Sequence, residues 1–354
     1  MKPNGNRYGT HRVIEPLGTL PQPARVVNND MSEIWDNELL IDVLRLNVDS
    51  ASFHQIKEKL ISQGHKDDLE QAFANHVIDL TNRTGKHKNE DTGSGGMLIG
   101  RVAAIGPKFE MKDEIKVGDT IATLVSLSLT PLKVNKVKKV YLNKDQVDIE
   151  GQAILFSSGI YAKLPDDMDE NLALSVLDVA GAPAQVERLA KPGDTVVILG
   201  AGGKSGILCN AVAKERVGIS GKVIGLVHSA RSIEVCYQTG CDVVEMADAT
   251  NAIQVEEIVS RLTGGKMADL VVNVVNVENT EMSTIMACKD RGMVYFFSMA
   301  TSFTRAALGA EGIGADVDMI LGNGYAHNHA AISIDLLRRN ETLMKIFKER
   351  YTDN

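Results

Sequence analysis

The sequence is poor in cysteine and lacks the close cysteine pairs that zinc knuckles and disulfide frameworks need. All its cysteines fall in the second half of the chain, and no two of them form a C-x-x-C motif. We therefore predict neither a disulfide framework nor a structural zinc site. The four cysteines are Cys209, Cys236, Cys241 and Cys288.

The chain also has no excess of basic residues. The chain has 38 Lys and Arg against 46 Asp and Glu, and this net charge of −8 argues against nucleic-acid and anionic-membrane partners. It has no apolar run of membrane-spanning length and no signal-like N-terminus, so we expect a cytoplasmic protein. A length of 354 residues, 44% of them hydrophobic, predicts two domains with sizeable cores.

The segment TVVILGAGGKSG at 195–206 is the most informative one present. An unbroken apolar run, a glycine cluster and a helical pattern over 207–217 predict a strand, a tight turn and a helix, which is the context of a dinucleotide site. The common spacing G-x-G-x-x-G would place its last glycine at Ser205, whereas the spacing G-x-x-G-x-x-G matches Gly200, Gly203 and Gly206. The alternative to a dinucleotide site is an ordinary turn that contains glycines. The expected cofactor-binding residues here are Gly200, Gly202, Gly203, Lys204, Ser205 and Gly206.

Strand and helix patterns alternate after this turn, which predicts a parallel sheet with helices on both faces. We expect strands at 222–227, 242–246, 269–275, 292–298 and 316–321, and one amphipathic helix at 330–351. Cofactors bind at the carboxyl ends of such strands. The expected cofactor residues there are His228, Ser229, Asn273, Ser298, Met299 and Ala300.

The end of the second strand bears on the choice between NAD and NADP. NAD sites usually carry an acidic residue there, but the segment 227–231 reads VHSAR, and the first carboxylate is Glu234 inside the next helix. Ser229 and Arg231 could hold a 2′-phosphate, with His228 contributing. We favour NADP over NAD, with a solvated Arg231 as the alternative.

The N-terminal half predicts a small β-rich domain with a helical insertion at about 52–81. Four histidines, His54, His65, His76 and His87, recur at spacings of eleven residues. Gly64 breaks the helix between them, so we expect solvated side chains and no metal site. The polar segment YGTHRVIEP at 8–16 is either a frayed end or a strap tied down over a site.

The chain resembles the medium-chain dehydrogenase/reductase superfamily. The family's first motif matches Gly100-Arg-Val-Ala-Ala-Ile-Gly106, and K-x-G-D turns stand at 116–119 and 191–194. The resemblance implies an α/β protein: a β-rich, GroES-like catalytic domain at 1–165, a Rossmann-type dinucleotide domain at 166–325, and a helix at 326–354 that packs back on the catalytic domain. Gly95, Gly96 and Met97 stand where zinc-dependent relatives have G-H-E, so we predict no metal.

At a finer level the segments at 8–16, 200–206 and 322–329 (GNGYAHNH) resemble the L-erythro-3,5-diaminohexanoate dehydrogenases of anaerobic lysine fermentation. The resemblance implies oxidative deamination of a small diamino acid with NAD(P). A zinc-independent quinone or enoyl reductase and a non-catalytic nucleotide-binding protein are the alternatives. The family resemblance also implies a homodimer or homotetramer, formed through the last strand of the cofactor sheet.

This chemistry needs a group that accepts the amine proton and charges that fix the substrate. Asp178 is the first candidate, because it interrupts the apolar run 172–180 near the place where zinc-dependent relatives carry their third ligand. A helix-surface aspartate is the alternative. Further candidates are Glu15 and His11, Arg12 as a carboxylate clamp, Tyr161 at the domain junction, and His327 and His329.

Overall fold

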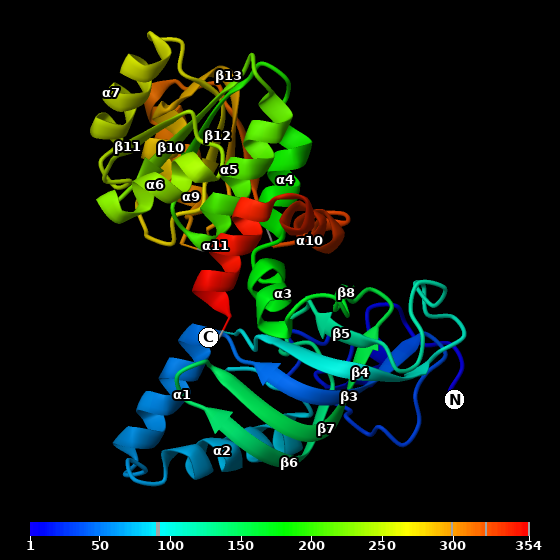
Figure 1. Ribbon diagram of the computed structural model, residues 1–354. Helices are drawn as coiled ribbons and strands as arrows, with labels where there is room; N and C mark the ends of the chain where they lie inside the picture. Colours follow the sequence, from blue (N-terminus) through cyan, green and yellow to red (C-terminus); the bar gives the residue numbers. More distant parts are fainter. Residues whose placement is uncertain (90–92, 299, 323, 353–354) are drawn as a thin grey trace. The chain divides into compact units, whose positions relative to one another are not determined.

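The computed structural model describes residues 1–89, 93–298, 300–322 and 324–352. It divides into two compact units, Met1–Asp166 and Asp167–Asn354 (Figure 1). Each unit has a sheet and hydrophobic core of its own.

An antiparallel six-stranded sheet in the order β6-β7-β3-β4-β5-β8 forms the first unit. The pair β1–β2 adds a separate two-stranded ribbon. The strand β7 lies between β3 and β6 and was not predicted from the sequence. The strands are β1 (Val13–Glu15), β2 (Val26–Val27), β3 (Glu38–Asn47), β4 (Met97–Ile105), β5 (Thr120–Thr123), β6 (Leu132–Tyr141), β7 (Gln146–Phe156) and β8 (Tyr161–Lys163).

The helical insertion lies between β3 and β4 and consists of α1 (Ser50–Ser62) and α2 (Leu69–Thr84). Asp49 caps α1 by accepting a hydrogen bond from the backbone N–H of Ser52. Phe53 and Phe73 stack with ring centroids 4.3 Å apart, which joins both helices to the core of the sheet. One of the four histidines departs from the expected solvation: His87 is completely buried.

The second unit has a parallel six-stranded sheet in the order β11-β10-β9-β12-β13-β14, the arrangement of a Rossmann fold. The apolar run of its central strand, 196–199, is buried on both faces, as the sequence predicts. The strands are β9 (Thr195–Leu199), β10 (Lys222–Val227), β11 (Val243–Met246), β12 (Ala268–Asn273), β13 (Cys288–Phe296) and β14 (Asp318–Leu321).

Helices cover both faces of this sheet (Figure 1). The predicted single C-terminal helix is wrong in one respect: the chain breaks at Asn340 into α10 and α11, and both helices pack on α3. Asn340 ends α10 in an extended conformation and caps α11 through its side chain. The elements are α3 (Glu170–Leu177), α4 (Gly181–Leu189), α5 (Lys204–Val217), η2 (Ala230–Ser232), α6 (Ile233–Gln238), α7 (Ala252–Thr263), α8 (Glu281–Met286), α9 (Phe303–Ile313), α10 (His329–Arg339) and α11 (Glu341–Tyr351), with η1 (Thr10–Arg12) in the first unit.

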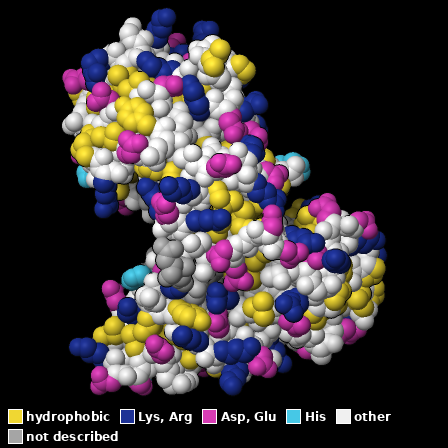
Figure 2. Space-filling view, in the orientation of Figure 1, with side chains coloured by type: hydrophobic (Ala, Val, Ile, Leu, Met, Phe, Trp, Pro, Cys, Tyr) yellow, Lys and Arg dark blue, Asp and Glu magenta, His cyan; other side chains and the backbone are white. Residues whose placement is uncertain are grey.

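Basic and acidic side chains are interspersed over the faces of both units in Figure 2. This mixture agrees with the modest negative net charge. Among the described residues, none of the helices has the length and apolar character needed to cross a membrane.

Candidate cofactor and active site

The glycine turn between β9 and α5 is shaped by contacts that exclude side chains. Gly200 has φ +86°, which L-residues rarely adopt. A Cβ on Gly206 would lie 2.3 Å from the Gly200 carbonyl oxygen, so the first turn of α5 can pack on the loop only with glycine there. Gly203 faces open space except for that same oxygen, which would lie 3.4 Å from a Cβ at this position. The turn therefore presents bare backbone on its outer side.

The N-terminus of α5 follows directly and has no side-chain cap. Gly203 occupies the N-cap position, and the partly exposed Lys204 and Ser205 begin the first turn. Uncapped N–H groups at the positive end of a helix dipole bind anions, and glycines allow a pyrophosphate to approach closely. The residues present therefore fit the pyrophosphate of a dinucleotide.

The end of β10 lies beside this turn, because a Cβ on Gly202 would be 2.4 Å from that of Ser232 in η2. His228 and Arg231 are exposed, and Ser229 is half-buried and precedes η2. Arg231 makes no hydrogen bond or ion pair with any residue that the structure describes. The predicted 2′-phosphate residues thus share one region with the glycine turn.

Three further residues contact the turn and escaped sequence analysis. Asn210, buried in α5, donates from Nδ2 to the Ala201 carbonyl at 3.1 Å and so fixes the loop. Arg350 of α11 approaches the Gly202 carbonyl at 3.5 Å, across 148 residues of sequence. The Tyr351 ring centroid lies 5.8 Å from the Lys204 ammonium. No local pattern signals a contact at such separation.

The residues predicted at the ends of β12 and β13 differ in their roles. Asn273 is fully buried and donates to the hydroxyls of Thr280 and Thr284, both at 2.8 Å, while its Oδ1 accepts from the Val275 N–H. These bonds indicate that Asn273 holds the following loop in place. They argue against a direct contact between its side chain and the cofactor. Ser298 Oγ accepts a hydrogen bond from the Ala300 N–H at 3.1 Å. Met299 lies outside the described residues.

Asp178 follows α3, and its carboxylate pairs with the Lys204 ammonium at 2.5 Å. The side chain of Asp178 is 57% exposed and that of Lys204 is 30% exposed. The candidate acid or base is thus accessible and lies next to the expected pyrophosphate site.

The predicted carboxylate clamp, Arg12, is instead buried within a polar network of the first unit. It is 2% exposed, and its guanidinium makes two bonds of 2.7 Å to the Glu38 carboxylate. Its remaining donors meet backbone carbonyls of Asn28, Asp30 and Glu33. Because every donor is engaged, this geometry favours a structural role for Arg12.

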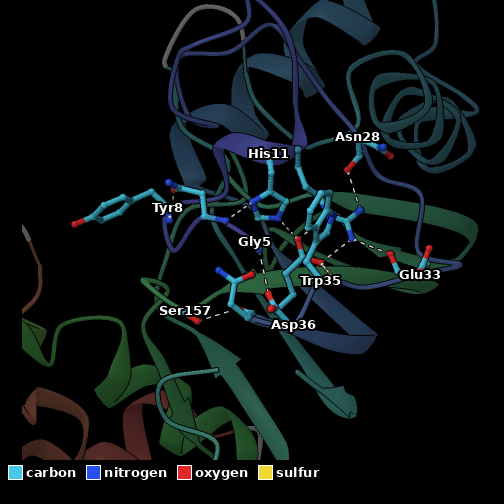
Figure 3. A network of polar contacts seen from close by, with 12 residues as sticks. Gly5, Tyr8, His11, Asn28, Glu33, Trp35, Asp36 and Ser157 are labelled. Atoms are coloured by element: carbon cyan, nitrogen blue, oxygen red, sulfur yellow. Dashed lines mark hydrogen bonds and ion pairs between the residues drawn. The ribbon is translucent and has the colours of Figure 1, made fainter. Parts of the chain in front are cut away.

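His11 belongs to the same network and packs against Trp35, with ring centroids 4.6 Å apart and ring planes tilted by 53° (Figure 3). The Asn6 backbone N–H donates to His11 Nδ1, so Nε2 carries the proton and donates to Glu38 at 2.7 Å. The segment 8–16 is therefore tied down on the first unit. Glu15, in contrast, is exposed and pairs with the exposed Arg25.

Tyr161 in β8 packs against the core of the first unit. Its hydroxyl is buried and makes no hydrogen bond with a described residue. Burial, with the charges of Glu114 and Asp119, raises the pKa of Tyr161 to about 12. The phenol therefore stays protonated at neutral pH and suits a hydrogen-bond donor better than a base.

Comparisons with known proteins give this geometry a context. The N-terminal domain family of L-erythro-3,5-diaminohexanoate dehydrogenase matches residues 11–165. The enzyme of that name from Acetoanaerobium sticklandii is 53% identical over 348 residues, which cover 98% of this chain and 99% of the relative. The chain belongs to the L-erythro-3,5-diaminohexanoate dehydrogenase family. The relative of the same name from Fusobacterium nucleatum has the same identity and coverage.

Membership in this family confirms the expected dehydrogenase. Among solved structures, an Escherichia coli quinone oxidoreductase complexed with NADPH is similar with a TM-score of 0.50 and 15% identity, covering 94% of this chain and 87% of its own. This likeness confirms the expected α/β fold, with a β-rich domain and a Rossmann-type parallel sheet.

Proposed function

We propose that this chain catalyses the reversible oxidative deamination of L-erythro-3,5-diaminohexanoate to 5-amino-3-oxohexanoate, with NADP preferred over NAD. The observation that carries the proposal is 53% identity, across 98% of the chain, to two enzymes named for that substrate. The uncapped glycine turn of the second unit supports a dinucleotide cofactor. The exposed Arg231 supports a preference for NADP, and so does the sequence VHSAR at the end of β10, which contains no acidic residue.

A bound nicotinamide supplies the acceptor for the hydride that leaves C3 of the substrate. The reaction also releases the amine proton and consumes one water, so the products are the ketone, ammonium, the reduced nicotinamide and one proton. Asp178 is proposed to accept the amine proton and to attract the substrate ammonium. Its exposed carboxylate supports this role, and Lys204 is proposed to hold the pyrophosphate beside it.

We propose a reaction without a metal ion. Among the described parts of the chain, His, Cys, Asp and Glu side chains form no group of three or more that could hold one. The four cysteines are buried in the second unit.

A homodimer or homotetramer is proposed as the working assembly, with a small diamino acid as substrate and neither nucleic acid nor membrane as partner. The edge strand β14 supports it, because this strand pairs only with β13 among the described strands. Sedimentation velocity should show a species of two or four chains. A monomer at micromolar concentration would contradict this assembly.

The deciding experiment supplies 3,5-diaminohexanoate with NADP or NAD, with and without a chelator, and follows reduced nicotinamide. Turnover that survives chelation and is faster with NADP supports the proposal. D178N should lower kcat by about 100-fold or more. D167N is the matched control, because Asp167 is an exposed partner of Arg338. No turnover with either cofactor would redirect the search to quinone and enoyl substrates.

A further inference from the structure

A second polar pocket lies in the second unit, away from the glycine turn. It has a volume of about 260 Å³ and lies between α4, the strands β13 and β14, and the residues Gly322, Tyr325, Ala326 and His327. In the sheet, β12 and β13 separate β14 from the cofactor strand β9, a distance of about 14 Å at ~4.8 Å per strand. None of the residues that the proposed reaction uses lines this pocket.

Its most telling feature is an unsatisfied amide. Gln185 is 6% exposed, and its Nε2 is buried without a hydrogen-bond partner while the residue lines the cavity. A buried donor left unpaired costs about 1–3 kcal/mol of stability, so native proteins rarely keep one. A ligand with an acceptor atom would satisfy it.

A free positive charge stands on the same helix face. Arg188 follows Gln185 by three residues, a spacing that places both side chains on one side of α4. The guanidinium is exposed and makes no hydrogen bond or ion pair with any described residue. Arg188 lines the same pocket as the buried Tyr295.

The rest of the lining favours an anion. Tyr295, Tyr325 and His327 bring further polar groups, and none of the described lining residues is acidic. Ile320 and Leu321 give the cavity an apolar wall. Arginine binds carboxylate and phosphate groups through two parallel hydrogen bonds.

We propose that this pocket is a binding site for the carboxylate or phosphate group of a small metabolite, held by Arg188 and Gln185. The site is separate from the cofactor turn, and the proposal does not depend on the proposed function. An organic acid and a phosphate ester share this oxyanion chemistry, and titration distinguishes them.

Isothermal titration calorimetry of the full chain, saturated with NADP, should detect binding of succinate or inorganic phosphate. The tighter ligand identifies the source of the oxyanion. Uncharged succinamide should not bind. R188Q should weaken binding by roughly 10- to 100-fold, and Q185M by roughly threefold to tenfold. R291Q is the matched control, because Arg291 is 85% exposed and lies outside the pocket.

A second readout detects the site directly. The side-chain amide signal of Gln185 in an NMR spectrum, assigned by its loss in Q185M, should shift on titration in wild type and not in R188Q. Sedimentation of R188Q should match wild type. The proposal would be overturned if binding were not saturable, if R188Q bound as tightly as wild type, or if NADP competed with the ligand. A changed oligomeric state of R188Q would also overturn it.

Discussion

Arg12 and Glu38 form a bidentate ion pair inside the first unit, with both bonds 2.7 Å long and both side chains at most 2% exposed. Burial alone would raise the pKa of Glu38, but Arg12 and His11 hold it below its usual value. The pair joins η1 to β3, so it anchors the N-terminal segment to the sheet.

Removing one partner should be strongly destabilising, because the other charge stays buried without compensation. We expect E38A to lower the free energy of unfolding by about 3–5 kcal/mol. Urea denaturation at neutral pH measures this. E15A is the control, because its exposed pair with Arg25 should contribute less than about 1 kcal/mol. Equal effects of the two variants would refute the structural role of Glu38.

Gly206→Ala should disrupt the glycine turn. The new methyl would lie 2.3 Å from the Gly200 carbonyl oxygen, so loop and helix must separate. We expect a loss of roughly 2 kcal/mol or more in stability and weaker NADPH binding, measured by urea denaturation and nucleotide fluorescence. Gly312→Ala, in open space on α9, should instead gain about 0.5–1 kcal/mol and bind normally.

His87 should make the protein sensitive to mild acid. Burial lowers the pKa of His87 from 6.5 to about 4, and neither ring nitrogen has a hydrogen-bond partner among the described residues. The unfolded state therefore binds the proton first, and stability falls as pH drops from about 6.5 towards about 4. At about pH 5 the loss from this group is roughly 2 kcal/mol.

Replacing His87 removes that sensitivity. H87L should be more stable than wild type at about pH 5, with the difference shrinking near neutral pH, as measured by urea denaturation at both values. H54L is the control, because His54 is exposed and should leave the pH profile unchanged. A wild-type profile in H87L would mean that His87 does not titrate as its burial requires.

Arg231 should distinguish the two nicotinamide dinucleotides. Only NADP carries the 2′-phosphate, so R231Q should weaken NADPH binding about tenfold and leave NADH binding within about twofold. Fluorescence titration with each nucleotide checks this. R261Q on α7, whose arginine pairs with Glu245, should change neither. Equal weakening of both nucleotides would show that Arg231 contacts a part they share.

Local patterns predicted the cofactor half of this protein well. The run at 196–199, the glycines at 200–206 and the alternation that follows are short-range features, and each specifies a strand, turn or helix by itself. The helices of the insertion and the break at Gly64 could be predicted from the sequence for the same reason. Boundaries were less accurate: the strand expected at 292–298 spans Cys288–Phe296.

Side-chain roles depended on the tertiary structure. The sequence places Arg12 in a polar segment and Asn273 at a strand end where cofactors bind, but in the fold their side-chain donors are engaged by other residues of the protein. In the same way, only the fold brings Asp178 to Lys204, Arg350 to the glycine turn, and Gln185 with Arg188 to the end of β14. The sequence by itself determined the elements, because periodicity and turn chemistry act over a few residues. Only the tertiary structure decided which polar groups are free to act, because partners far apart in the chain compete for each donor.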